Sequence, residues 1–231
     1  LKPSTKKCLL QIIIDGFQYA IQAAARKQLP VYVNFSIQFS ALFVFFASCQ
    51  IEYLSQYFDI TILYYNPNIY PQEEYNRRLE ELINFLPKFN PAIQNNVKLV
   101  KLDYNPQEFY DSIHIKEHPE LATEKEKGIR CYNCYEFRLK KAFEYAINNN
   151  FDWFTTTLSI SPFKDAENIN DIGKKLEQTI SQINSSCNLK FLTSDFKKKG
   201  GFKRSLEISS EYDLYRQQYC GCVYSMNNSS K

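Results

Sequence analysis

The amino-acid sequence predicts an α/β fold in which helices cover both faces of a parallel sheet. Short apolar stretches that are typical of strands alternate along the chain with longer stretches whose apolar residues recur at helical spacing. Such alternation favours a parallel sheet, because each connection between parallel strands has room for a helix. The 231 residues, 44% of them hydrophobic, suffice for one large domain with a substantial core.

The individual elements follow from the same patterns. Strands are expected at residues 59–65, 97–104, 151–161 and 188–193, where apolar or β-branched runs end in turns or loops. Helices are expected at residues 6–27, 50–57, 73–85, 165–183 and 205–212, and also after Cys134. Ligands of such folds bind at the carboxyl ends of the strands. We therefore expect the functional site in the loops after Tyr65, Asp103, Thr157 and Thr193.

Residues 31–49, VYVNFSIQFSALFVFFASC, contain no charge and are long enough to raise the question of a membrane span. Apolar and polar residues alternate from Val31 to Ser40, and this period of two is typical of a strand rather than of a transmembrane helix. We therefore expect a core strand, no membrane contact and a cytoplasmic protein. The expected division is an N-terminal helical extension at residues 1–29 and a single α/β domain at residues 30–231.

Four of the seven cysteines form two tight pairs, which in an intracellular chain favours metal or redox chemistry. Cys131 and Cys134 lie at the start of a predicted helix, whose N-terminus is expected to lower their pKa values. Such a pair can bind zinc, bind an iron–sulfur cluster, form a redox disulfide, or remain two reduced cysteines. Cys8 and Cys187 are isolated, and we interpret them as structural or incidental.

Cys220 and Cys222 are separated only by Gly221, so a disulfide between them would close a small, strained ring. Strained disulfides are more oxidising and are reduced and reformed more easily. Glycine permits the sharp turn, and the nearby Arg216 could stabilise a thiolate. The alternative is a coincidental pair near a loose terminus, but the tyrosines around it indicate a packed tail.

The segment DFKKKGGFKRS gathers positive charge around a Gly-Gly turn, with two interleaved phenylalanines. Lysine and arginine neutralise phosphates, and aromatic faces stack on bases, so this segment is a candidate nucleic-acid contact. The alternative is a solvated surface loop. The whole-chain net charge of +3 names no partner by itself. The basic residues of the segment are Lys197, Lys198, Lys199, Lys203 and Arg204.

Two further polar groups carry weaker signals. His114 and His118 have the spacing of a helical metal site, but Pro119 ends any helix there, so we expect exposed histidines. The three threonines at residues 155–157 are explained as strand residues by their β-branching, and their hydroxyls could also line a pocket.

The chain resembles the QueH-type epoxyqueuosine reductases over roughly residues 50 to 225. The resemblance rests on the ordered set YYNPNIYPQEEYNRRLEEL, RCYNCYEFRLKKA, FDWFTTTLSISPFKDAENINDIG and FLTSDFKKKGGFKRSLEISSEYDLYRQQYCGCVYS. It implies a Rossmann-like fold of the nucleotide α-hydrolase group. It also implies reduction of epoxyqueuosine to queuosine at the wobble position of tRNA, with two electrons and two protons consumed and water released.

The resemblance also assigns residues to roles. Cys131 and Cys134 match two ligands of a [4Fe–4S] cluster, and Cys220 and Cys222 match a redox-active pair. An electron donor and tRNA are the implied partners. The basic segment and Arg216 would then bind the RNA. The proton donor for epoxide opening stays open between Asp195, Tyr219 and Tyr135.

The chain departs from the family where the family has an N-terminal Cys-Cys-x-Pro-Cys segment with the other two cluster ligands. Residues 35–45 read FSIQFSALFVF and contain no cysteine, proline or histidine, and Cys49 is a single nearby thiol. Two thiolates do not easily hold a four-iron cluster. We therefore predict impaired activity. The alternatives are an RNA-binding relative that kept the fold without the chemistry, and, from the uncharged run, a membrane-anchored redox protein.

A pair of compensating frameshifts would explain the departure. The codons for Ala41 to Ala47, read one base later, can encode Pro-Cys-Ser-Ser-Ser-Ser-Pro, which resembles part of the missing segment. One shift before residue 40 and another near Cys49 would alter only this stretch. The DNA sequence across residues 30–50 tests the hypothesis, because a shifted frame without Pro-Cys excludes it.

Overall fold

The central feature of the protein is a parallel sheet with strand order β3-β2-β1-β4-β5. The computed structural model describes the backbone of residues 34–39, 44–183 and 187–229. Within these residues the strands are β1 (Asn34–Phe39), β2 (Asp59–Tyr64), β3 (Lys98–Lys101), β4 (Trp153–Thr156) and β5 (Lys190–Phe191). The predicted α/β fold with a parallel sheet is confirmed, and the uncharged run supplies its middle strand, β1.

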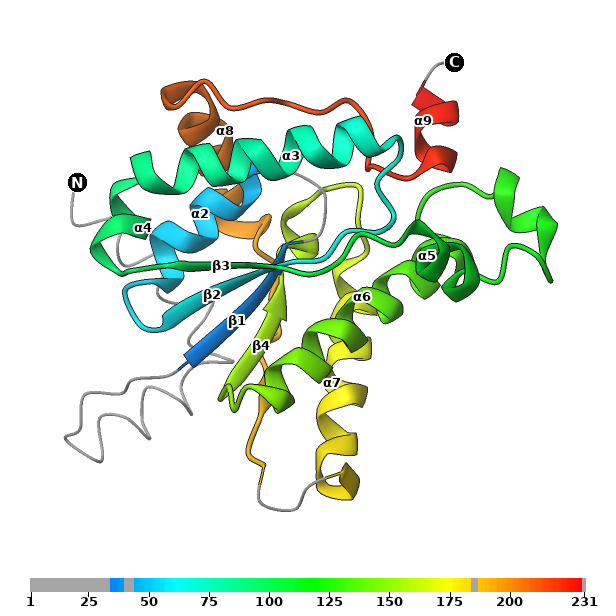
Figure 1. Cartoon of the computed structure of the whole chain (residues 1–231), viewed down its shortest axis with the longest axis horizontal. Coiled ribbons are helices and arrows are strands. Elements are labelled where there is room, and N and C mark those ends of the chain that lie inside the picture. The colour runs from blue at the N-terminus through cyan, green and yellow to red at the C-terminus, as the bar shows by residue number, and fades with distance from the viewer. Residues whose placement is uncertain (1–33, 40–43, 184–186, 230–231) are drawn as a thin grey trace.

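Helices cover both faces of the sheet (Figure 1). On one face lie α2, α3 and α4, with α8 packed on α2, and on the other lie α6 and α7. The described helices are α2 (Val44–Leu54), α3 (Gln72–Phe85), α4 (Asn90–Gln94), α5 (Pro106–Ser112), α6 (Ile129–Asn148), α7 (Ala166–Ile183), α8 (Gly201–Glu211) and α9 (Val223–Ser229). Short 3₁₀ turns form η1 (Leu86–Lys88), η2 (Pro119–Thr123), η3 (Leu158–Ile160) and η4 (Lys198–Gly200).

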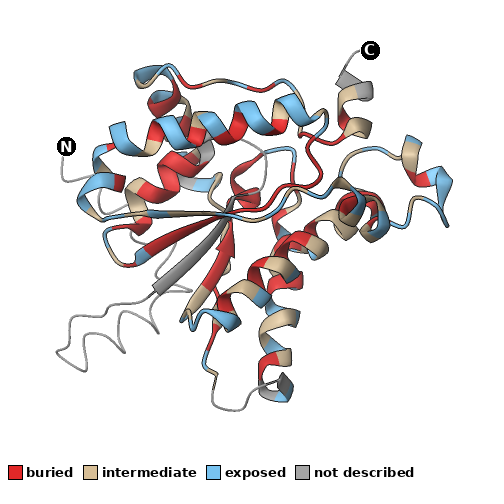
Figure 2. Cartoon of the chain, in the orientation of Figure 1, coloured by how far each residue is buried: buried red, intermediate tan, exposed pale blue. Residues whose placement is uncertain are grey.

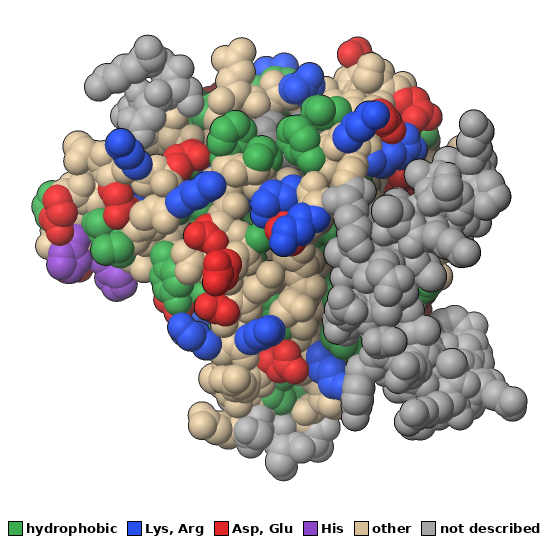
Figure 3. Space-filling view, turned by 180° about the vertical axis from the view of Figure 1, so that it is seen from behind, with side chains coloured by type: hydrophobic (Ala, Val, Ile, Leu, Met, Phe, Trp, Pro, Cys, Tyr) green, Lys and Arg blue, Asp and Glu red, His purple; other side chains and the backbone are tan. Residues whose placement is uncertain are grey.

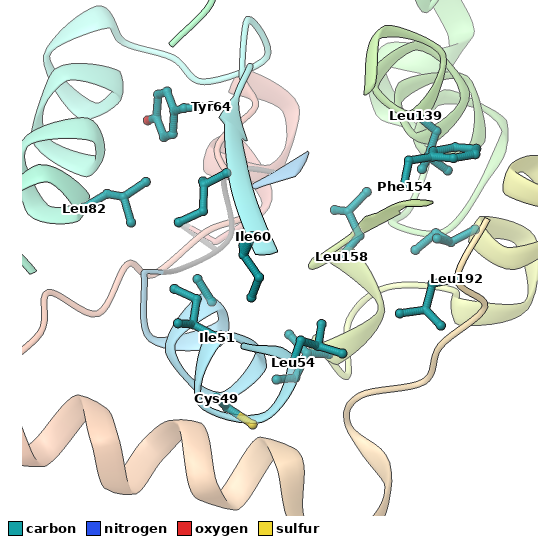
Figure 4. Packing of buried hydrophobic residues seen from close by; sticks show 14 of the residues in the cluster. Cys49, Ile51, Leu54, Ile60, Tyr64, Leu82, Leu139, Phe154, Leu158 and Leu192 are labelled. Carbon is teal, nitrogen blue, oxygen red and sulfur yellow. The ribbon is translucent and has the colours of Figure 1, made fainter. Parts of the chain in front are cut away.

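The core fills the space between the sheet and its two helical layers. In β2 every residue after Asp59 is buried, as expected for a strand that is covered on both faces. Ile60 and Tyr64 lie near Leu82 of α3, while Phe154 of β4 lies near Leu139 of α6 (Figure 4). The burial pattern in Figure 2 follows the same arrangement, with buried residues concentrated along β2, β4 and the inner sides of the helices.

Several boundaries differ from the sequence prediction. Helix α2 begins at Val44 rather than at residue 50, and α8 begins at Gly201 rather than at residue 205. The short helix α5 was not expected, and its first turn is capped by Asn105, whose side chain accepts a hydrogen bond from the Gln107 amide at 3.2 Å. The predicted helix at residues 6–27 and the predicted extension at residues 1–29 lie outside the described residues.

None of the described helices is long and apolar enough to cross a bilayer. After α8 the chain runs along α3 as an extended segment and ends in α9 (Figure 1). This segment, residues 212–222, carries the second cysteine pair and brings it towards the carboxyl ends of the strands.

Candidate active site: a thiol cavity beside buried cations

Both cysteine pairs line one small cavity, which we call the thiol cavity. Asn68, in the loop after β2, and Leu158, directly after β4, place this cavity at the carboxyl ends of the strands. The segments after Tyr65 and Thr157 therefore contribute as predicted, and the segment after Asp103 contributes Phe109 of α5, whereas none of the lining residues comes from the loop after Thr193. The lining residues are Asn68, Phe109, Arg130, Cys131, Cys134, Tyr135, Arg138, Leu158, Lys164, Cys220 and Cys222.

Helix α6 presents Cys131 and Cys134 on one face, because residues three apart on a helix are neighbours. The helix start is fixed by the Glu124 carboxylate, which accepts hydrogen bonds from the Ile129 and Arg130 amides, each at 2.8 Å. The predicted lowering of the thiol pKa values is wrong. Burial raises the pKa of Cys131 and raises that of Cys134 to about 11, so desolvation outweighs the helix N-terminus.

The tail presents Cys220 and Cys222 as two free thiols whose sulfur atoms lie 3.8 Å apart. A hydrogen bond from the Cys222 thiol lowers the pKa of Cys220 well below its usual value and raises that of Cys222. Burial opposes the first shift and adds to the second. The two sulfur atoms are therefore unequal in acidity, and they are close enough for a small rotation to bring them together.

The turn between these cysteines is fastened to the loop before α3. The Tyr70 amide donates to the Gly221 carbonyl at 2.8 Å, and the Tyr219 hydroxyl donates to the Tyr70 carbonyl. Gly221 has a φ of +118°, and a Cβ atom there would lie 2.9 Å from Nη1 of Arg78. Both the backbone conformation and this close approach require glycine, so the turn geometry of the pair is fixed by its surroundings.

Three cationic side chains, Arg130, Arg138 and Lys164, are buried at the cavity, and no carboxylate is among its lining residues. Unpaired buried charge is costly, so the cavity favours negative charge in its interior. Lys164 is 3% exposed, and its nearest carboxylate oxygen, on Glu126, is 3.9 Å away. The charge of Cys220 and of neighbouring groups raises the pKa of Lys164 although burial alone lowers it.

The cavity offers the type of side chain that binds an iron–sulfur cluster, but it offers too few of them. Thiolates are its usual ligands, and a cationic surrounding stabilises an anionic group. Beyond Cys220 and Cys222, only Cys131 and Cys134 supply thiols among the lining residues that the structure describes. Across the described residues, no three Cys, His, Asp or Glu side chains are arranged to hold a metal ion. Cys49 is buried in α2 and is not a lining residue, and burial raises its pKa to about 12.

The basic segment at residues 197–204 lies outside the cavity, and its charges are largely compensated within the protein. The Asp195 carboxylate contacts Lys197 at 2.6 Å and Lys198 at 3.3 Å, and Arg204 contacts Glu52 at 2.6 and 2.8 Å. Lys203 is exposed, and the side chain of Lys199 lies outside the described residues. In Figure 3 positive and negative side chains are interspersed rather than gathered into one basic face.

The candidate proton donors are now distinguished by position. Tyr135 lines the cavity, and its buried hydroxyl has no hydrogen-bond partner among the described residues. Tyr219 is not a lining residue and donates its hydroxyl to the Tyr70 carbonyl, while Asp195 contacts two lysines. Tyr135 therefore remains as the candidate whose hydroxyl is available inside the cavity.

The remaining predicted residues lie elsewhere. Arg216 is exposed and does not line the cavity. His114 and His118 are exposed as expected, and Nδ1 of His118 lies 3.1 Å from Glu120. The threonines at residues 155–157 are buried without lining the cavity, and Thr155 donates its hydroxyl to the Leu192 carbonyl at 2.9 Å.

Sequence reasoning missed the cavity's cations. Lys164 is a single lysine after a Ser-Pro turn, and Arg138 lies one turn after Cys134 within a helix that contains several basic residues. Neither forms a cluster in the sequence. The one available signal was their position, because Lys164 follows the strand-end loop after Thr157 and Arg138 shares a helix face with Cys134.

Comparison with known proteins identifies the family. A family profile described as "Epoxyqueuosine reductase QueH" matches residues 46–228. A relative from Streptococcus pyogenes serotype M1, named Epoxyqueuosine reductase QueH, is 40% identical over 174 residues, covering 75% of this chain and 64% of the relative. A relative of the same name from Staphylococcus aureus strain Mu50 is 40% identical, and the match covers 75% of this chain and 68% of the relative. Another, from Haemophilus influenzae, is 37% identical, and the match covers 75% of this chain and 64% of the relative.

Two cysteine pairs at the strand ends define the class as an α/β protein with a dithiol site, and the relatives that match it carry the name of a reductase. More specifically, the chain belongs to the QueH epoxyqueuosine reductase family. It spans less than two thirds of the Streptococcus pyogenes relative. The family match begins at residue 46, so the departing segment at residues 35–45 lies before it.

Proposed function

We propose that this chain reduces epoxyqueuosine to queuosine at the wobble position of tRNA, using Cys220 and Cys222 as the immediate two-electron donor. The observation that carries the proposal is the pairing of two free cysteine side chains, with sulfur atoms 3.8 Å apart, at a cavity of the family-matched region. We also infer a Rossmann-like fold of the nucleotide α-hydrolase group. The strand order β3-β2-β1-β4-β5 and a cavity at the strand ends support this finer assignment.

The reaction balances on these two sulfur atoms. The two carbon–oxygen bonds of the epoxide break, a carbon–carbon double bond forms, and the oxygen leaves as water. The pair loses two electrons and becomes the Cys220–Cys222 disulfide, and the two protons of the water come from the cysteine pair and from solvent. An external two-electron donor must then reduce this disulfide before another turnover. The strained ring expected for a disulfide across one residue makes that reduction easier.

The chain's own residues prepare this chemistry. The hydrogen bond from Cys222 lowers the pKa of Cys220 and so favours the thiolate, which is the reactive form of a cysteine. Tyr135 presents a hydroxyl inside the cavity, where it can donate a hydrogen bond to the epoxide oxygen. Cys131 and Cys134 match two of the ligands of an iron–sulfur cluster, a group that would supply electrons, but two thiolates do not complete its ligand set. Phe109 and Leu158 are apolar lining residues and limit the water in the cavity.

We further propose that repeated turnover is impaired in this chain. The support is the absence of cysteine from residues 35–45, which leaves only Cys131 and Cys134 as cluster ligands beside the redox pair. A pre-reduced protein is expected to convert one substrate per dithiol and then stop. Anaerobic reconstitution with iron and sulfide counted tests this. A full cluster that supports many turnovers would overturn the impairment, and failure to form any queuosine from pre-reduced protein would overturn the assigned reaction.

One observation favours a second candidate. The absence of cysteine from residues 35–45 also agrees with a relative that binds RNA without reducing it. In such a protein, Lys203 and the exposed part of the basic segment would contact phosphates. Such a protein would bind unmodified and modified tRNA with equal affinity, and its dithiol would stay reduced when epoxyqueuosine tRNA is added. Oxidation of the dithiol by the modified tRNA alone separates the two functions.

A further inference from the structure

Exposed apolar side chains adjoin the thiol cavity. Five large hydrophobic residues are exposed among the described residues, and three of them lie next to the cavity in sequence or by direct contact. Phe163, 65% exposed, directly precedes the lining residue Lys164, and Ile129, 61% exposed, directly precedes the lining residue Arg130. The amide of Tyr70, which is 45% exposed, donates to the carbonyl between the two tail cysteines at 2.8 Å. Apolar surface that gathers at one site is typical of an interaction surface.

The loops that carry Phe163 and Ile129 lie next to each other. Nζ of Lys164 is 3.9 Å from Oε1 of Glu126, so the loop after η3 contacts the loop before α6. The Phe163 amide donates to the Ser161 hydroxyl at 3.2 Å, which defines the turn that presents the ring. From this turn Lys164 is buried, whereas Phe163, one residue earlier, stays exposed to solvent. The ring is therefore held outward by a defined turn.

The loop before α6 divides its charges between the protein and the solvent. The Glu124 carboxylate accepts hydrogen bonds from the first two amides of α6, and Glu126 lies against the buried lysine of the cavity. Lys125 and Lys127 alternate with these glutamates and are exposed, and neither forms an ion pair with a carboxylate of the described residues. The outer side of this loop is therefore positively charged.

An exposed aromatic ring beside uncompensated lysines is the combination that binds single-stranded nucleic acid. Aromatic rings stack on unpaired bases, and lysines contact the phosphates between them. The basic segment at residues 197–204 offers less of this chemistry, because Asp195 and Glu52 compensate three of its cations. A nucleotide that enters the cavity also forces its neighbours in the strand to cross the residues that border the cavity.

We propose that these residues form an RNA-binding surface, the cavity rim, which holds the strand on either side of the nucleotide that enters the cavity. Phe163 stacks on a neighbouring unpaired base, and Lys125 and Lys127 contact the adjoining phosphates. The choice of RNA rests on the proposed function, whose substrate is a nucleotide of a tRNA loop. The cavity rim consists of Tyr70, Lys125, Lys127, Ile129 and Phe163.

Replacement of the exposed ring tests the stacking contact. The probe is an unmodified anticodon stem-loop RNA, which can bind but cannot be reduced, and the dissociation constant is measured by fluorescence anisotropy. Phe163→Ala is expected to weaken binding about fivefold or more, because a base–aromatic stack is lost. Phe163→Tyr keeps the aromatic face and should retain the affinity, whereas Phe163→Leu keeps only apolar bulk and should not. Ile93→Ala, at an exposed apolar residue of α4, is the matched control with no change.

The salt dependence of the same binding tests the phosphate contacts. A protein with both Lys125→Gln and Lys127→Gln is expected to show a slope of log affinity against log salt that is smaller by about 1.4, the value for two phosphates of a single strand. The matched control changes Lys174 and Lys175, two exposed lysines of α7, to Gln and should keep the parent slope.

The backbone of Lys127 allows charge and folding to be separated. Its φ of +72° is a conformation that suits glycine better than a residue with a side chain. Lys127→Gly is therefore expected to keep the urea midpoint close to that of the parent protein while it weakens RNA binding. A purely structural role of Lys127 would instead lower the midpoint and leave the affinity of the folded protein unchanged, which would overturn its phosphate contact.

Two further results would overturn the proposal. The first is unchanged stem-loop affinity in folded Phe163→Ala and in the double lysine variant, or equal losses in their controls. The second is normal RNA binding by these variants together with slower reduction of their Cys220–Cys222 disulfide by thioredoxin, because the surface would then bind a protein donor.

The binding measurements separate this proposal from the proposed function. A protein that loses stem-loop affinity in the rim variants but never forms queuosine would retain the cavity rim and exclude the reaction. Queuosine formation with parental kcat/KM in the same variants would retain the reaction and exclude the cavity rim.

Discussion

The thiol cavity and the basic segment both gather lysine and arginine side chains, yet their charges are compensated in opposite ways. In the basic segment, Asp195 and Glu52 lie within 3.3 Å of the cations they compensate. In the cavity, three cations are buried and no carboxylate is a lining residue. The exposed run is prominent in the sequence, and its charges are largely neutralised by close carboxylates. The buried cations are dispersed in the sequence, and their partners are mostly uncharged oxygen atoms, apart from Glu126 at 3.9 Å from Lys164. Chemistry is therefore expected at the cavity.

The largest expected effect concerns the hydrogen bond within the cysteine pair. Cys222→Ala removes the main cause that lowers the pKa of Cys220, so that pKa rises and the thiolate fraction at pH 7 falls. The midpoint of the pH profile of Cys220 alkylation is expected to move up by about one to two pH units, the equivalent of one hydrogen bond to a charged group. Cys222→Ser keeps a hydroxyl donor and should shift the midpoint less. Equal pH profiles in the parent protein, Cys222→Ala and Cys222→Ser would contradict the hydrogen bond from Cys222 as the cause of the lowered pKa of Cys220.

Among the described residues, Gly200 of the basic segment and Gly221 of the cysteine turn both have positive φ, and they provide a matched stability test. Gly221→Ala places a Cβ atom 2.9 Å from Arg78 and forces an unfavourable φ of +118°, while Gly200, at +89°, has nothing within 4 Å of the added atom. We expect Gly221→Ala to lower the free energy of unfolding by about 3 kcal/mol and Gly200→Ala by about 1 kcal/mol. Urea denaturation measures both. Equal losses would show that the tail is not fixed at the cavity.

A smaller effect is expected from adjacent cations of the basic segment. Lys203 is exposed, so Lys203→Gln is expected to weaken tRNA binding a few-fold and to reduce the salt dependence by about one phosphate contact. Arg204→Gln breaks a partly exposed ion pair with Glu52, so it should cost no more than about 1 kcal/mol of stability and change binding little. Binding titrations at several salt concentrations distinguish them. A larger binding loss for Arg204→Gln would mean that its pair opens to bind RNA.

The sequence patterns anticipated the fold better than the site's electrostatics. Apolar runs located β2 and β3, and the period of two in the uncharged run predicted the strand β1, because strand burial leaves a local trace. Helix α5 has only seven residues and depends on a cap at Asn105, so its polar sequence gave little helical signal.

The cysteine pairs were found by spacing, but their ionisation was not. The expected lowering of the Cys131 and Cys134 pKa values considered only the helix N-terminus. Burial by the tail and by the loop after β4 depends on tertiary contacts and reverses the sign. Lys164 was missed for the same reason, since a lone lysine gains its meaning only from the thiols that the fold brings around it.

The most direct test of the central claim is a single-turnover experiment in which thiols and product are counted together. Pre-reduced protein, free of external reductant, is mixed anaerobically with tRNA containing epoxyqueuosine. Queuosine is then quantified by nucleoside mass spectrometry, and the Cys220–Cys222 disulfide by differential alkylation. Equal amounts of queuosine and disulfide are predicted, with Cys187→Ser unchanged and Cys220→Ser inactive. Queuosine formed while both thiols stay reduced would contradict the role of the thiol cavity.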